Sequence, residues 1–401
     1  MLAHGRLFEE LHHRIGTRIM LMPLPSILSV VLGFALLALL QVESATSGGS
    51  SVQGLDGQIP IIVDTDMGTD DWMALSYVVS STKANLLGVT IVGNGLAPCN
   101  EGVRNARYLL GLSPEDADRP VGCGSTWPMD GYASYPQMWR RNAADMMGET
   151  ALSAQHKESY VDGPTLLADL LANSPEPVLI LTIGSMTNIA TVLKLSPHLK
   201  KKIKVVVSMG GAVHAEGNLR VPGFTDTLRN TKAEWNYYID PVAAKIVFES
   251  GIPIKLVPLD ATNQLPLTEA FILRTEQLRK TALGAFVNRT FTWISQSVNN
   301  GEYYHWDPLT AVISLNPDIC NKVERLHLGV TTDSGSDAGV PSGQPMSLFP
   351  YYSFEGERRK PLNDNAAGAT ILSLTGTYVD VCLHADAAAY EDNFLTTLGA
   401  D

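Results

Sequence analysis

An acidic cluster is the strongest chemical signal in this sequence: Asp64, Asp66, Asp70 and Asp71 stand within eight residues of one another. Carboxylates at such short range repel one another unless positive charge compensates them. An acidic helix cap followed by a solvated loop would explain Asp70 and Asp71, but Asp64 and Asp66 directly follow an apolar run. Hard cations such as Ca²⁺ and Mg²⁺ prefer oxygen ligands of this kind. We therefore predict a divalent metal site at this cluster.

The segment before the cluster, Ile59 to Val63, is short, apolar and continuous, which is typical of a strand buried on both faces. Strand-like and helix-like segments alternate after it. Predicted strands cover residues 86–92, 178–181, 203–209 and 254–258, and predicted helices cover 71–80, 99–110, 187–195, 241–249, parts of 268–298, and 306–315. This order predicts an α/β fold, with an open, mostly parallel, Rossmann-like sheet flanked by helices in a single large domain over 58–401. In such sheets the active site lies beyond the carboxyl ends of the strands, where the acidic cluster falls.

The composition excludes several classes of protein. Of 401 residues, 45% are hydrophobic and 17% are charged, so the chain can bury a large core and is not wholly disordered. Lys and Arg number 29 against 41 Asp and Glu, a net charge of −12, which argues against a nucleic-acid binder that depends on overall positive charge. We interpret the basic run at 200–204 as a solvated face. The four cysteines form no CxxC pair; we interpret most of them as buried apolar fillers, and their spacing specifies no pairing.

Residues 1–45 are interpreted as a targeting segment outside the fold. Three arginines precede an apolar stretch whose uninterrupted part, Ile27 to Leu40, is short for a membrane span and typical of a signal peptide. An uncleaved signal anchor is the alternative. Residues 46–57 are rich in Ser and Gly and are predicted to form a flexible linker. The protein is thus expected to be secreted, periplasmic or within the secretory pathway, with membrane attachment only if the segment stays uncleaved. Asn288 begins a formal glycosylation triplet on a predicted helix.

The segment from Asp64 to Asp71 resembles the DxDxGxDD motif of the inosine-uridine-preferring nucleoside hydrolase family. Five later segments resemble further motifs of this family in the same order, and six ordered segments are far more specific than one. They are the second strand with its Asn at 90–95, the loop and helix at 183–190, the Met-Gly-Gly turn at 209–211, the run from Gly217-Asn218 to Asp240-Pro241, and His305-Trp306-Asp307-Pro308. The resemblance spans residue 61 to about 311 and is loose beyond about 315.

The resemblance implies calcium-dependent hydrolysis of the N-glycosidic bond of ribonucleosides to free base and ribose, through a transition state with oxocarbenium-ion character. It implies that Ca²⁺ is held by Asp66, Asp71, Asp307 and the backbone carbonyl of Ile183, where the family usually has Thr. Because that ligand is a carbonyl, Ile should be tolerated. The cation would orient the attacking water and lower its pKa, and Asp66 would accept the water proton as general base. Asn94 would help to position the water and the ligands.

The resemblance also assigns residues to the substrate. Asp70 and Asn236 would bind the ribose 2′- and 3′-hydroxyls, and Asn218 and Glu234 would hold the 5′-hydroxyl. Met209 would lie under the sugar. An isolated loop Asn or an isolated Met would first be given a structural role, but the order of these residues within the family pattern favours substrate binding. A small-molecule ribonucleoside is the expected partner, nucleic acid is not expected to bind, and a homodimer or homotetramer is the expected assembly.

Two tryptophans predict a preference for purine nucleosides. The chain resembles the purine-specific branch of the family in its Tyr-Tyr-x-Trp-Asp segment, which ends at Trp306 and Asp307, and Trp139 lies in a segment resembling that branch's other base-stacking element. Stacking on an aromatic side chain contributes about 1–3 kcal/mol per base, so two tryptophans would sandwich a purine well. The non-specific branch has a His directly before its metal-binding Asp, where Trp306 stands here. The alternative is a non-specific purine and pyrimidine nucleoside hydrolase in which a shifted His305 serves as general acid.

Two other classes of protein compete with this interpretation. Asp64-Thr65-Asp66 also resembles the opening motif of haloacid-dehalogenase-like phosphatases, but the later segments supply Asn and Glu where that family needs a Lys and an acidic pair. A calcium-dependent nucleoside or sugar binder that has lost catalysis is the second. The presence of Asp66, the expected base, argues against a binder, and release of ribose from inosine would separate the two.

Overall fold

The described part of the chain begins just after the predicted linker. The computed structural model describes residues 57–130, 133–150, 158–297, 302–332, 366–373 and 376–399. The predicted targeting segment 1–45 and nearly all of the linker 46–57 lie outside the described residues. Within the described ranges, every helix is too short or too polar to cross a bilayer.

One sheet of ten strands runs through the described residues, in the order β4-β3-β2-β1-β5-β6-β7-β10-β8-β9. Neighbouring strands from β4 to β10 in this order are parallel, and β8 and β9 extend the sheet by antiparallel pairing. The predicted open, mostly parallel sheet is confirmed. The strands are β1 (Ile59–Thr65), β2 (Ala84–Ile91), β3 (Val121–Cys123), β4 (Val161–Asp162), β5 (Val178–Thr182), β6 (Ile203–Met209), β7 (Ile254–Val257), β8 (Cys320–Val330), β9 (Thr370–Leu372) and β10 (Thr377–Ala385).

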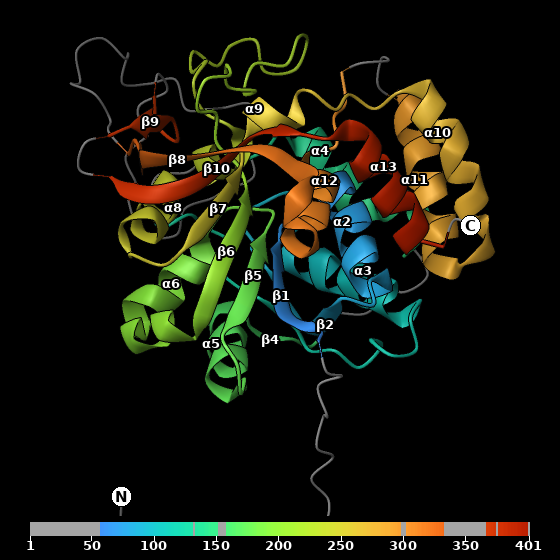
Figure 1. Ribbon diagram of the computed structural model, residues 1–401, viewed down its shortest axis with the longest axis horizontal. Helices are drawn as coiled ribbons and strands as arrows, with labels where there is room; N and C mark the ends of the chain where they lie inside the picture. The colour runs from blue at the N-terminus through green and yellow to red at the C-terminus, as the bar shows by residue number, and fades with distance from the viewer. Residues whose placement is uncertain are drawn as a thin grey trace, which may run out of the picture. The chain divides into compact units, whose positions relative to one another are not determined.

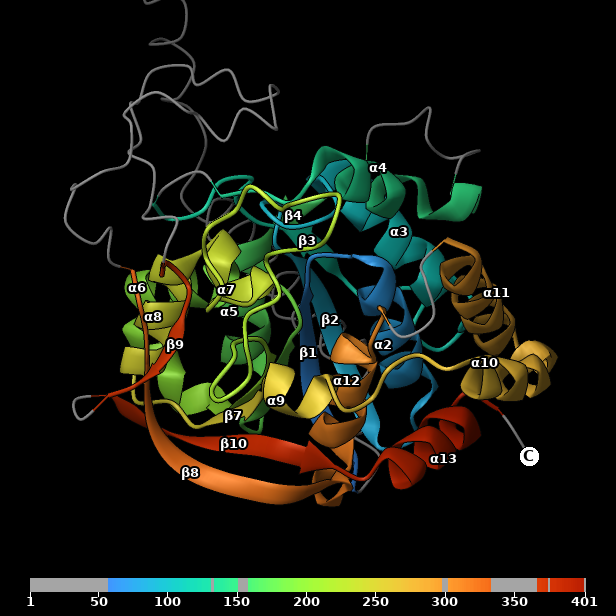
Figure 2. The same ribbon diagram turned by 90° about the horizontal axis from the view of Figure 1, so that it is seen from above.

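Helices cover both faces of the sheet (Figure 1). Helices α2, α3, α11, α12 and α13 lie on one side of the central strands, and α5, α6 and α8 lie on the other (Figure 2). The α-helices are α2 (Thr69–Ser80), α3 (Cys99–Gly111), α4 (Gln137–Asp145), α5 (Gly163–Asn173), α6 (Thr187–Leu195), α7 (Trp235–Ile239), α8 (Pro241–Glu249), α9 (Leu259–Thr262), α10 (Glu269–Thr275), α11 (Ala282–Ser297), α12 (Trp306–Leu315) and α13 (Ala387–Thr397). The 3₁₀ helices are η1 (Met146–Gly148), η3 (Pro197–Lys202), η4 (Glu276–Lys280) and η5 (Pro317–Ile319).

Strand β1 is buried on both faces, as its continuous apolar run predicts. Ile61 and Val63 pack into the core under α2 and α12, while Ile62, which points the other way, packs into the core under α5, α6 and α8. Alternate side chains of a strand face opposite sides of the sheet, so an apolar residue is needed at every position of a central strand. The acidic cluster therefore begins at the end of a strand that is packed on both faces.

The predicted strands and helices up to Leu315 are present, with ends that match or differ by at most two residues. Sequence reasoning did not predict β3, β4 and α5, and it assigned no elements beyond Leu315, where β8 to β10 and α13 lie. Strands β3 and β4 have only three and two residues, too few for an alternating pattern to be visible. Strand β8 is an outer strand of mixed exposure, so its sequence lacks the apolar continuity of β1.

The cysteines are buried, as interpreted, but they are not merely apolar fillers, because all four are paired in disulfides. The structure joins Cys99 to Cys123 and Cys320 to Cys382, and it leaves no cysteine free. The first disulfide connects the start of α3 to the end of β3, and the second connects the antiparallel strands β8 and β10. The pairing depends on which strands become neighbours, which the spacing along the chain does not show.

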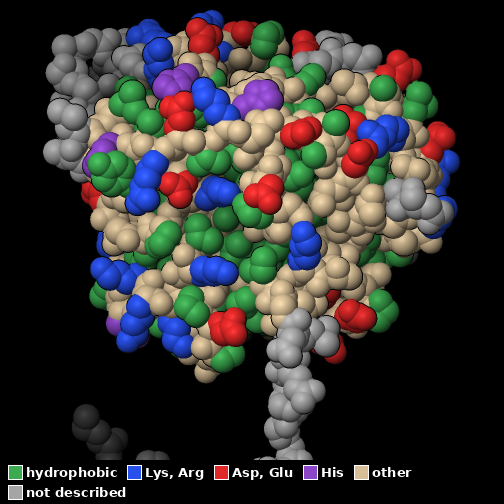
Figure 3. Space-filling model, viewed as in Figure 1, with side chains coloured by type: hydrophobic (Ala, Val, Ile, Leu, Met, Phe, Trp, Pro, Cys, Tyr) green, Lys and Arg blue, Asp and Glu red, His purple; other side chains and the backbone are tan. Residues whose placement is uncertain are grey.

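The basic run at 200–204 lies on η3 and the start of β6. Lys200 and Lys201 are exposed, and Lys202 is half-buried with its ammonium group 2.8 Å from the carbonyl of Ser174. This confirms a solvated face. On the side of the molecule shown in Figure 3, basic and acidic side chains are interspersed.

Candidate active site

Four predicted site residues follow the carboxyl ends of four adjacent strands. Asp66 follows β1, Asn94 lies just beyond β2, Ile183 follows β5, and Met209 ends β6. These strands are parallel neighbours in the order β2-β1-β5-β6, so their carboxyl ends meet at one edge of the sheet. The topology thus brings together residues that stand more than 140 positions apart in the chain, from Asp66 to Met209.

Two helices deliver the remaining carboxylates to this edge. Asp70 and Asp71 lie in the first turn of α2, and Asp307 lies in the first turn of α12, which packs against α2. One carboxylate oxygen from each of Asp70, Asp71 and Asp307 lies within 4.8 Å of the others. Helix N-termini carry partial positive charge, which offsets part of the repulsion between these groups. The structure therefore assembles an oxygen-rich cluster from both ends of the domain.

Asp71 is held by the backbone around it. The Thr65 hydroxyl donates a hydrogen bond to Oδ1 of Asp71, the Asp66 amide donates to the same oxygen at 3.1 Å, and the Gly68 amide donates to Oδ2 at 2.9 Å. Asp64 points elsewhere: its Oδ1 accepts from Thr90 at 2.5 Å and from Asn188 at 2.8 Å. Asp64 thus supports the neighbouring strands, in agreement with its omission from the predicted metal ligands.

The turn after β1 is strained at a residue that is not glycine. Met67 has a φ of 57°, in the left-handed region, and the indole of Trp72 donates to its carbonyl at 2.8 Å. Gly68 has an ordinary φ of −71°, but a Cβ there would lie 2.4 Å from the side chain of Leu96. Gly68 is therefore needed for close approach of the next loop, whereas Met67 makes the turn.

Three carboxylate oxygens here are buried without a partner among the described residues: Oδ2 of Asp64, Oδ2 of Asp66 and Oδ1 of Asp307. Burial, followed by the charge of Asp71, raises the pKa of Asp66 well above its usual range. Burial, followed by the charges of Asp70 and Asp71, does the same to the pKa of Asp307. Burial and the charge of Asp71 also raise the pKa of Asp70 to about 7. Unpartnered buried carboxylate oxygens fit a divalent cation, because a cation would satisfy the oxygens and favour their charged form.

Asn236 joins the cluster to the floor of the site. Its amide nitrogen lies 3.5 Å from the carbonyl of Ile183 and 3.3 Å from the carbonyl of Met209. The sulfur of Met209 lies 3.5 Å from the same nitrogen, and the Met209 side chain is buried. The structure therefore brings Ile183, Met209 and Asn236 together, as predicted.

Glu234 and Asn218 lie beside Asn236. Glu234 caps α7: its Oε1 accepts from the amide of Asn236 at 2.8 Å, and its Oε2 accepts from the amide of Gly211 at 3.0 Å. Burial raises the pKa of Glu234 to about 7. Asn218 accepts from the amide of Trp235 at 3.2 Å. Both predicted 5′-hydroxyl residues thus stand next to the predicted ribose residue.

Asn94 takes part in a buried polar network. Its Oδ1 accepts from Ser185 at 2.7 Å, and its Nδ2 donates to Thr187 at 2.8 Å. Thr187 in turn donates to Asp240 at 2.7 Å. Asn94 is therefore fixed by the loop after β5.

Comparison with known protein families agrees with this geometry. The family model described as "Inosine-uridine preferring nucleoside hydrolase" matches residues 61–391. The chain belongs to this family. The non-specific ribonucleoside hydrolase RihC of Escherichia coli is 34% identical over 256 residues, 62% of this chain and 76% of its own. The pyrimidine-specific ribonucleoside hydrolase RihA of Salmonella typhimurium is 31% identical, over 75% of this chain and 91% of its own.

Solved structures share the fold of this nucleoside hydrolase. The inosine-uridine preferring nucleoside hydrolase of Bacillus anthracis superposes with a TM-score of 0.67 at 22% identity, covering 86% of this chain and 100% of its own. A purine-preferring ribonucleoside hydrolase from Gardnerella vaginalis gives a TM-score of 0.60 at 23% identity, covering 84% of this chain and 98% of its own. Proteins named as non-specific, pyrimidine-specific and purine-preferring hydrolases are thus all similar to this chain. The similarity alone therefore does not indicate which base this chain prefers.

The two predicted base-stacking tryptophans come from different segments, and both are half-buried. Trp139 on α4 packs its ring 5.5 Å from that of Trp235, the residue before Asn236, and 6.3 Å from that of Phe224. Trp306, at the start of α12, packs 4.9 Å from the ring of Tyr303. Among the ring contacts of the described residues, none joins Trp139 to Trp306. Each tryptophan thus lies beside a different part of the carboxylate and sugar site.

His305 does not have the position that a general acid needs. Its ring is buried and packs 4.6 Å from that of Phe271 and 5.6 Å from that of Phe291. Its Nδ1 lies 2.8 Å from the hydroxyl of Tyr390 on α13. Burial lowers the pKa of His305 to about 3, so the ring is neutral. The alternative with a shifted His305 as acid is not supported, because aromatic core residues hold the ring in place.

Sequence reasoning missed Tyr135 as a site residue. Its hydroxyl donates to Oδ1 of Asn236 at 2.9 Å, and its ring stacks on Trp235 with centroids 5.0 Å apart. Thr65 and Ser185, which bind Asp71 and Asn94, were also missed. These hydroxyls carry no local signal, because their partners are distant in sequence or set by the turn.

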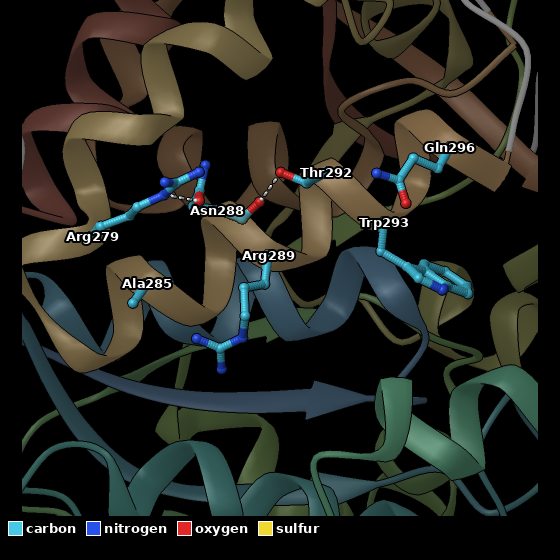
Figure 4. A pocket seen from close by; sticks show the side chains of 7 residues that line it. All are labelled: Arg279, Ala285, Asn288, Arg289, Thr292, Trp293 and Gln296. Carbon is cyan, nitrogen blue, oxygen red and sulfur yellow. Dashed lines mark hydrogen bonds between the residues drawn. The ribbon is translucent and has the colours of Figure 1, made fainter.

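A surface pocket of about 450 Å³ lies along α11, away from this site (Figure 4). It is lined by Arg279, Ala285, Asn288, Arg289, Thr292, Trp293 and Gln296, none of which is a carboxylate or a predicted site residue. Asn288 is 2% exposed, accepts from Arg279 at 2.7 Å and donates to Thr275 at 2.9 Å. Its amide is therefore inaccessible to glycosylation in the folded protein, and the formal acceptor triplet is not a usable site.

Proposed function

We propose that this nucleoside hydrolase cleaves the N-glycosidic bond of ribonucleosides in a calcium-dependent reaction, with a preference for purines. The observation that carries the proposal is the unpartnered, buried Oδ2 of Asp66 beside the oxygen cluster of Asp70, Asp71 and Asp307. Such an arrangement offers both a cation site and a base at the carboxyl edge of the sheet. The family membership supports the same reaction class.

Asp66 accepts the proton of the attacking water while the water oxygen bonds to C1′ and the bond from C1′ to the base breaks. The bonding electron pair leaves with the base nitrogen, which takes up a proton from solvent. Asp66, Asp71, Asp307 and the Ile183 carbonyl would hold the cation. When bound, Ca²⁺ would supply the positive charge that keeps these carboxylates ionised and lowers the pKa of the water.

The residues around Asn236 hold the ribose. Asp70 and Asn236 bind the 2′- and 3′-hydroxyls, and Glu234 and Asn218 bind the 5′-hydroxyl side. Glu234 is preorganised for this by the backbone amides that it caps, so little ordering remains to be done on binding. Met209 fills the floor beneath the sugar.

Trp139 and Trp306 stack on the base. Support comes from their half-buried rings, one beside Trp235 and the other directly before the ligand Asp307. A purine offers two fused rings to both faces, so it gains more from stacking than a pyrimidine does. The relatives named for their base preference include non-specific and pyrimidine-specific enzymes, so kinetic measurements on both classes of nucleoside test this preference.

The first experiment tests the reaction and the metal together. The full chain is incubated with inosine, and released ribose is measured as reducing sugar, before and after prolonged chelation. We expect chelation to abolish hydrolysis and added Ca²⁺ to restore it. Full activity in metal-free protein would overturn the assignment of Asp66, Asp71 and Asp307 as ligands, whereas binding of inosine without ribose release would indicate a binder.

The second experiment tests the base preference. kcat/KM is measured for inosine, adenosine, guanosine, uridine and cytidine in wild type, Trp139→Ala and the control Trp293→Ala, whose tryptophan lines the distant α11 pocket. Loss of one stacking partner should lower kcat/KM for purines by about tenfold or more and affect uridine less. Equal cleavage of uridine and inosine by wild type would show that the tryptophan sandwich is wrong.

We also propose that the protein is exported. Two disulfides among the described residues support an oxidising compartment, since such bonds are rare in the cytosol. The predicted signal peptide at 1–45 points to the same route, with a signal anchor as the alternative. The homodimer or homotetramer stays a prediction, which light scattering of the purified protein would test.

A further inference from the structure

We propose that the Cys99–Cys123 disulfide is a positioning element of the active site, which presses the loop after β2 against the catalytic base Asp66. This inference rests on the proposed function, because it gives Asp66 the role of base. It concerns a bond that the reaction itself does not require. The loop at residues 92–98 runs between the disulfide and Asp66, is anchored at both ends and contacts Asp66.

The loop forms one wall around Asp66. The amide of Ala97 donates to the backbone carbonyl of Asp66 at 2.8 Å. A Cβ on Gly95 would lie 2.1 Å from the Cβ of Asp66 and 2.6 Å from its Oδ2, the unpartnered oxygen. The same loop carries Asn94. A shift of the loop would therefore move the surroundings of the base and of Asn94 together.

The disulfide lies directly behind this wall. Cys99 is the first residue of α3, immediately after the loop, and Cys123 is the last residue of β3. A Cβ on Gly93 would lie 2.7 Å from the sulfur of Cys99, so the loop backbone runs against the disulfide. The amide of Gly124, next to Cys123, donates to the carbonyl of Ile91 at 2.9 Å. The bond thus ties the end of the loop to the rigid sheet.

The N-terminus of α3 has no side-chain cap, because its cap residue is Pro98. Besides the disulfide, Asn100 holds this end of the helix, since its Oδ1 accepts from the amide of Glu158 at 2.7 Å. Removing the cross-link would allow the start of α3 to move, and the loop would follow it. The tip of the loop would then be held by Arg140, which donates to the carbonyl of Gly95, and by the bonds of Asn94 to Ser185 and Thr187.

The second disulfide supplies a matched control. Cys320 and Cys382 join β8 to β10, and their contacts among the described residues involve Lys322 and His384 but no residue of the site. This bond spans 62 residues, against 24 for Cys99–Cys123. Because a longer closed loop restricts the unfolded chain more, its removal should lower the Tm at least as much. If both disulfides only stabilised the fold, the control variant C320A/C382A should therefore have a Tm as low as that of C99A/C123A or lower, and a loss of kcat at least as large.

The experiment compares C99A/C123A with C320A/C382A in the full chain with Ca²⁺ present. We expect C99A/C123A to lose about ten- to a hundredfold in kcat for inosine with little change in KM, since small misplacements of catalytic groups cost rates of this order. The control should keep the wild-type kcat despite its lower Tm. Gly93→Ala keeps the disulfide but should push the loop away from the sulfur of Cys99, so it should also lower kcat. This variant tests the proposal if C99A/C123A does not fold.

Hydrogen exchange supplies a readout that does not depend on activity. In C99A/C123A, amides at 93–98 should exchange faster than in wild type and in the control. Wild-type kcat and exchange in C99A/C123A would overturn the proposal, and so would an equal loss of kcat in the control. If wild type releases no ribose, the proposed function fails, while faster exchange at 93–98 confined to C99A/C123A would still support the positioning of this loop.

Discussion

Asp66 is the proposed ligand and base of the site. It follows a buried central strand of the sheet, it is 1% exposed, and one of its oxygens has no partner among the described residues. Leaving a buried carboxylate oxygen unpaired is costly unless a proton or a cation takes its place. In the proposed reaction this oxygen is the one left to accept a proton from water.

Asp66→Asn should lower kcat by about 10²–10⁴-fold, because a general base contributes an effect of this size and the amide cannot accept the water proton in the same way. Binding of inosine should survive in part, since Asn236 and Glu234 are unchanged. Steady-state kinetics and calorimetric inosine titration measure the two effects. Asp318→Asn, at an exposed carboxylate on η5, is the control. A near-wild-type kcat in Asp66→Asn would show that another residue activates the water.

Helix α8 illustrates how one buried carboxylate couples several elements. Asp240 caps α8 through the amide of Ala243 at 3.0 Å. It also accepts from Thr187 at the start of α6 at 2.7 Å and from the amide of Met129 at 2.8 Å. Because Thr187 also binds Asn94, this carboxylate connects two helices to the loop after β2.

Asp240→Ala should reduce the free energy of unfolding by on the order of 2–4 kcal/mol, from the lost cap and the buried donors left unpaired. Urea unfolding followed by circular dichroism measures this difference. Asp386→Ala is the matched control: Asp386 caps α13 through the amide of Ala389 at 3.0 Å, but its side chain is exposed. Its substitution should cost only about 1 kcal/mol. Equal losses in the two variants would contradict the coupling described for Asp240.

The whole molecule should respond to pH through its buried carboxyls. Burial raises the pKa of Asp64, Asp70 and Glu234 to about 7, from ordinary values of 3.8 for Asp and 4.5 for Glu. A carboxyl with a raised pKa in the folded state adds stability that is fully present below the unfolded pKa, and this stability is lost as pH rises through the folded pKa. The metal-free protein should therefore lose stability between about pH 4 and about pH 7.

Calcium should reduce this loss, because a bound cation would favour the ionised forms of its proposed ligands Asp66, Asp71 and Asp307 and of the neighbouring Asp70. Thermal unfolding of chelated and Ca²⁺-saturated protein at several pH values between about 4 and about 7 measures both effects. A metal-free protein that becomes more stable across this range would show that the acidic cluster is not strained by its own charge.

The mature chain should begin within the Ser/Gly-rich linker, near Ala45, if the apolar segment at 27–40 is a cleaved signal peptide. N-terminal sequencing of exported protein gives the answer directly. Membrane-bound material that keeps the residues before the linker would instead identify a signal anchor.

The residues with the strongest chemistry could be predicted from the sequence because their signals are local. Asp66 and Asp71 belong to one short motif after one apolar strand, and Asp307 stands in a recognisable segment at the start of a helix. The parallel sheet was also predictable, because buried central strands need continuous apolar runs and the helices between them have clear periodicity. Parallel strands bring their carboxyl ends to one edge, so the place of the site followed from the order of the elements.

Only the tertiary structure decided features that depend on which surfaces meet. It paired Cys99 with Cys123 because β3 became a neighbour of β2, and β3 is too short to be seen in the sequence. It placed the ring of His305 in the aromatic core, beside Tyr390, which is 85 residues away in the sequence. It also buried Asn288 against Arg279. Side-chain orientation and burial are set by packing between distant segments, and such contacts leave no periodic or motif signal in one chain.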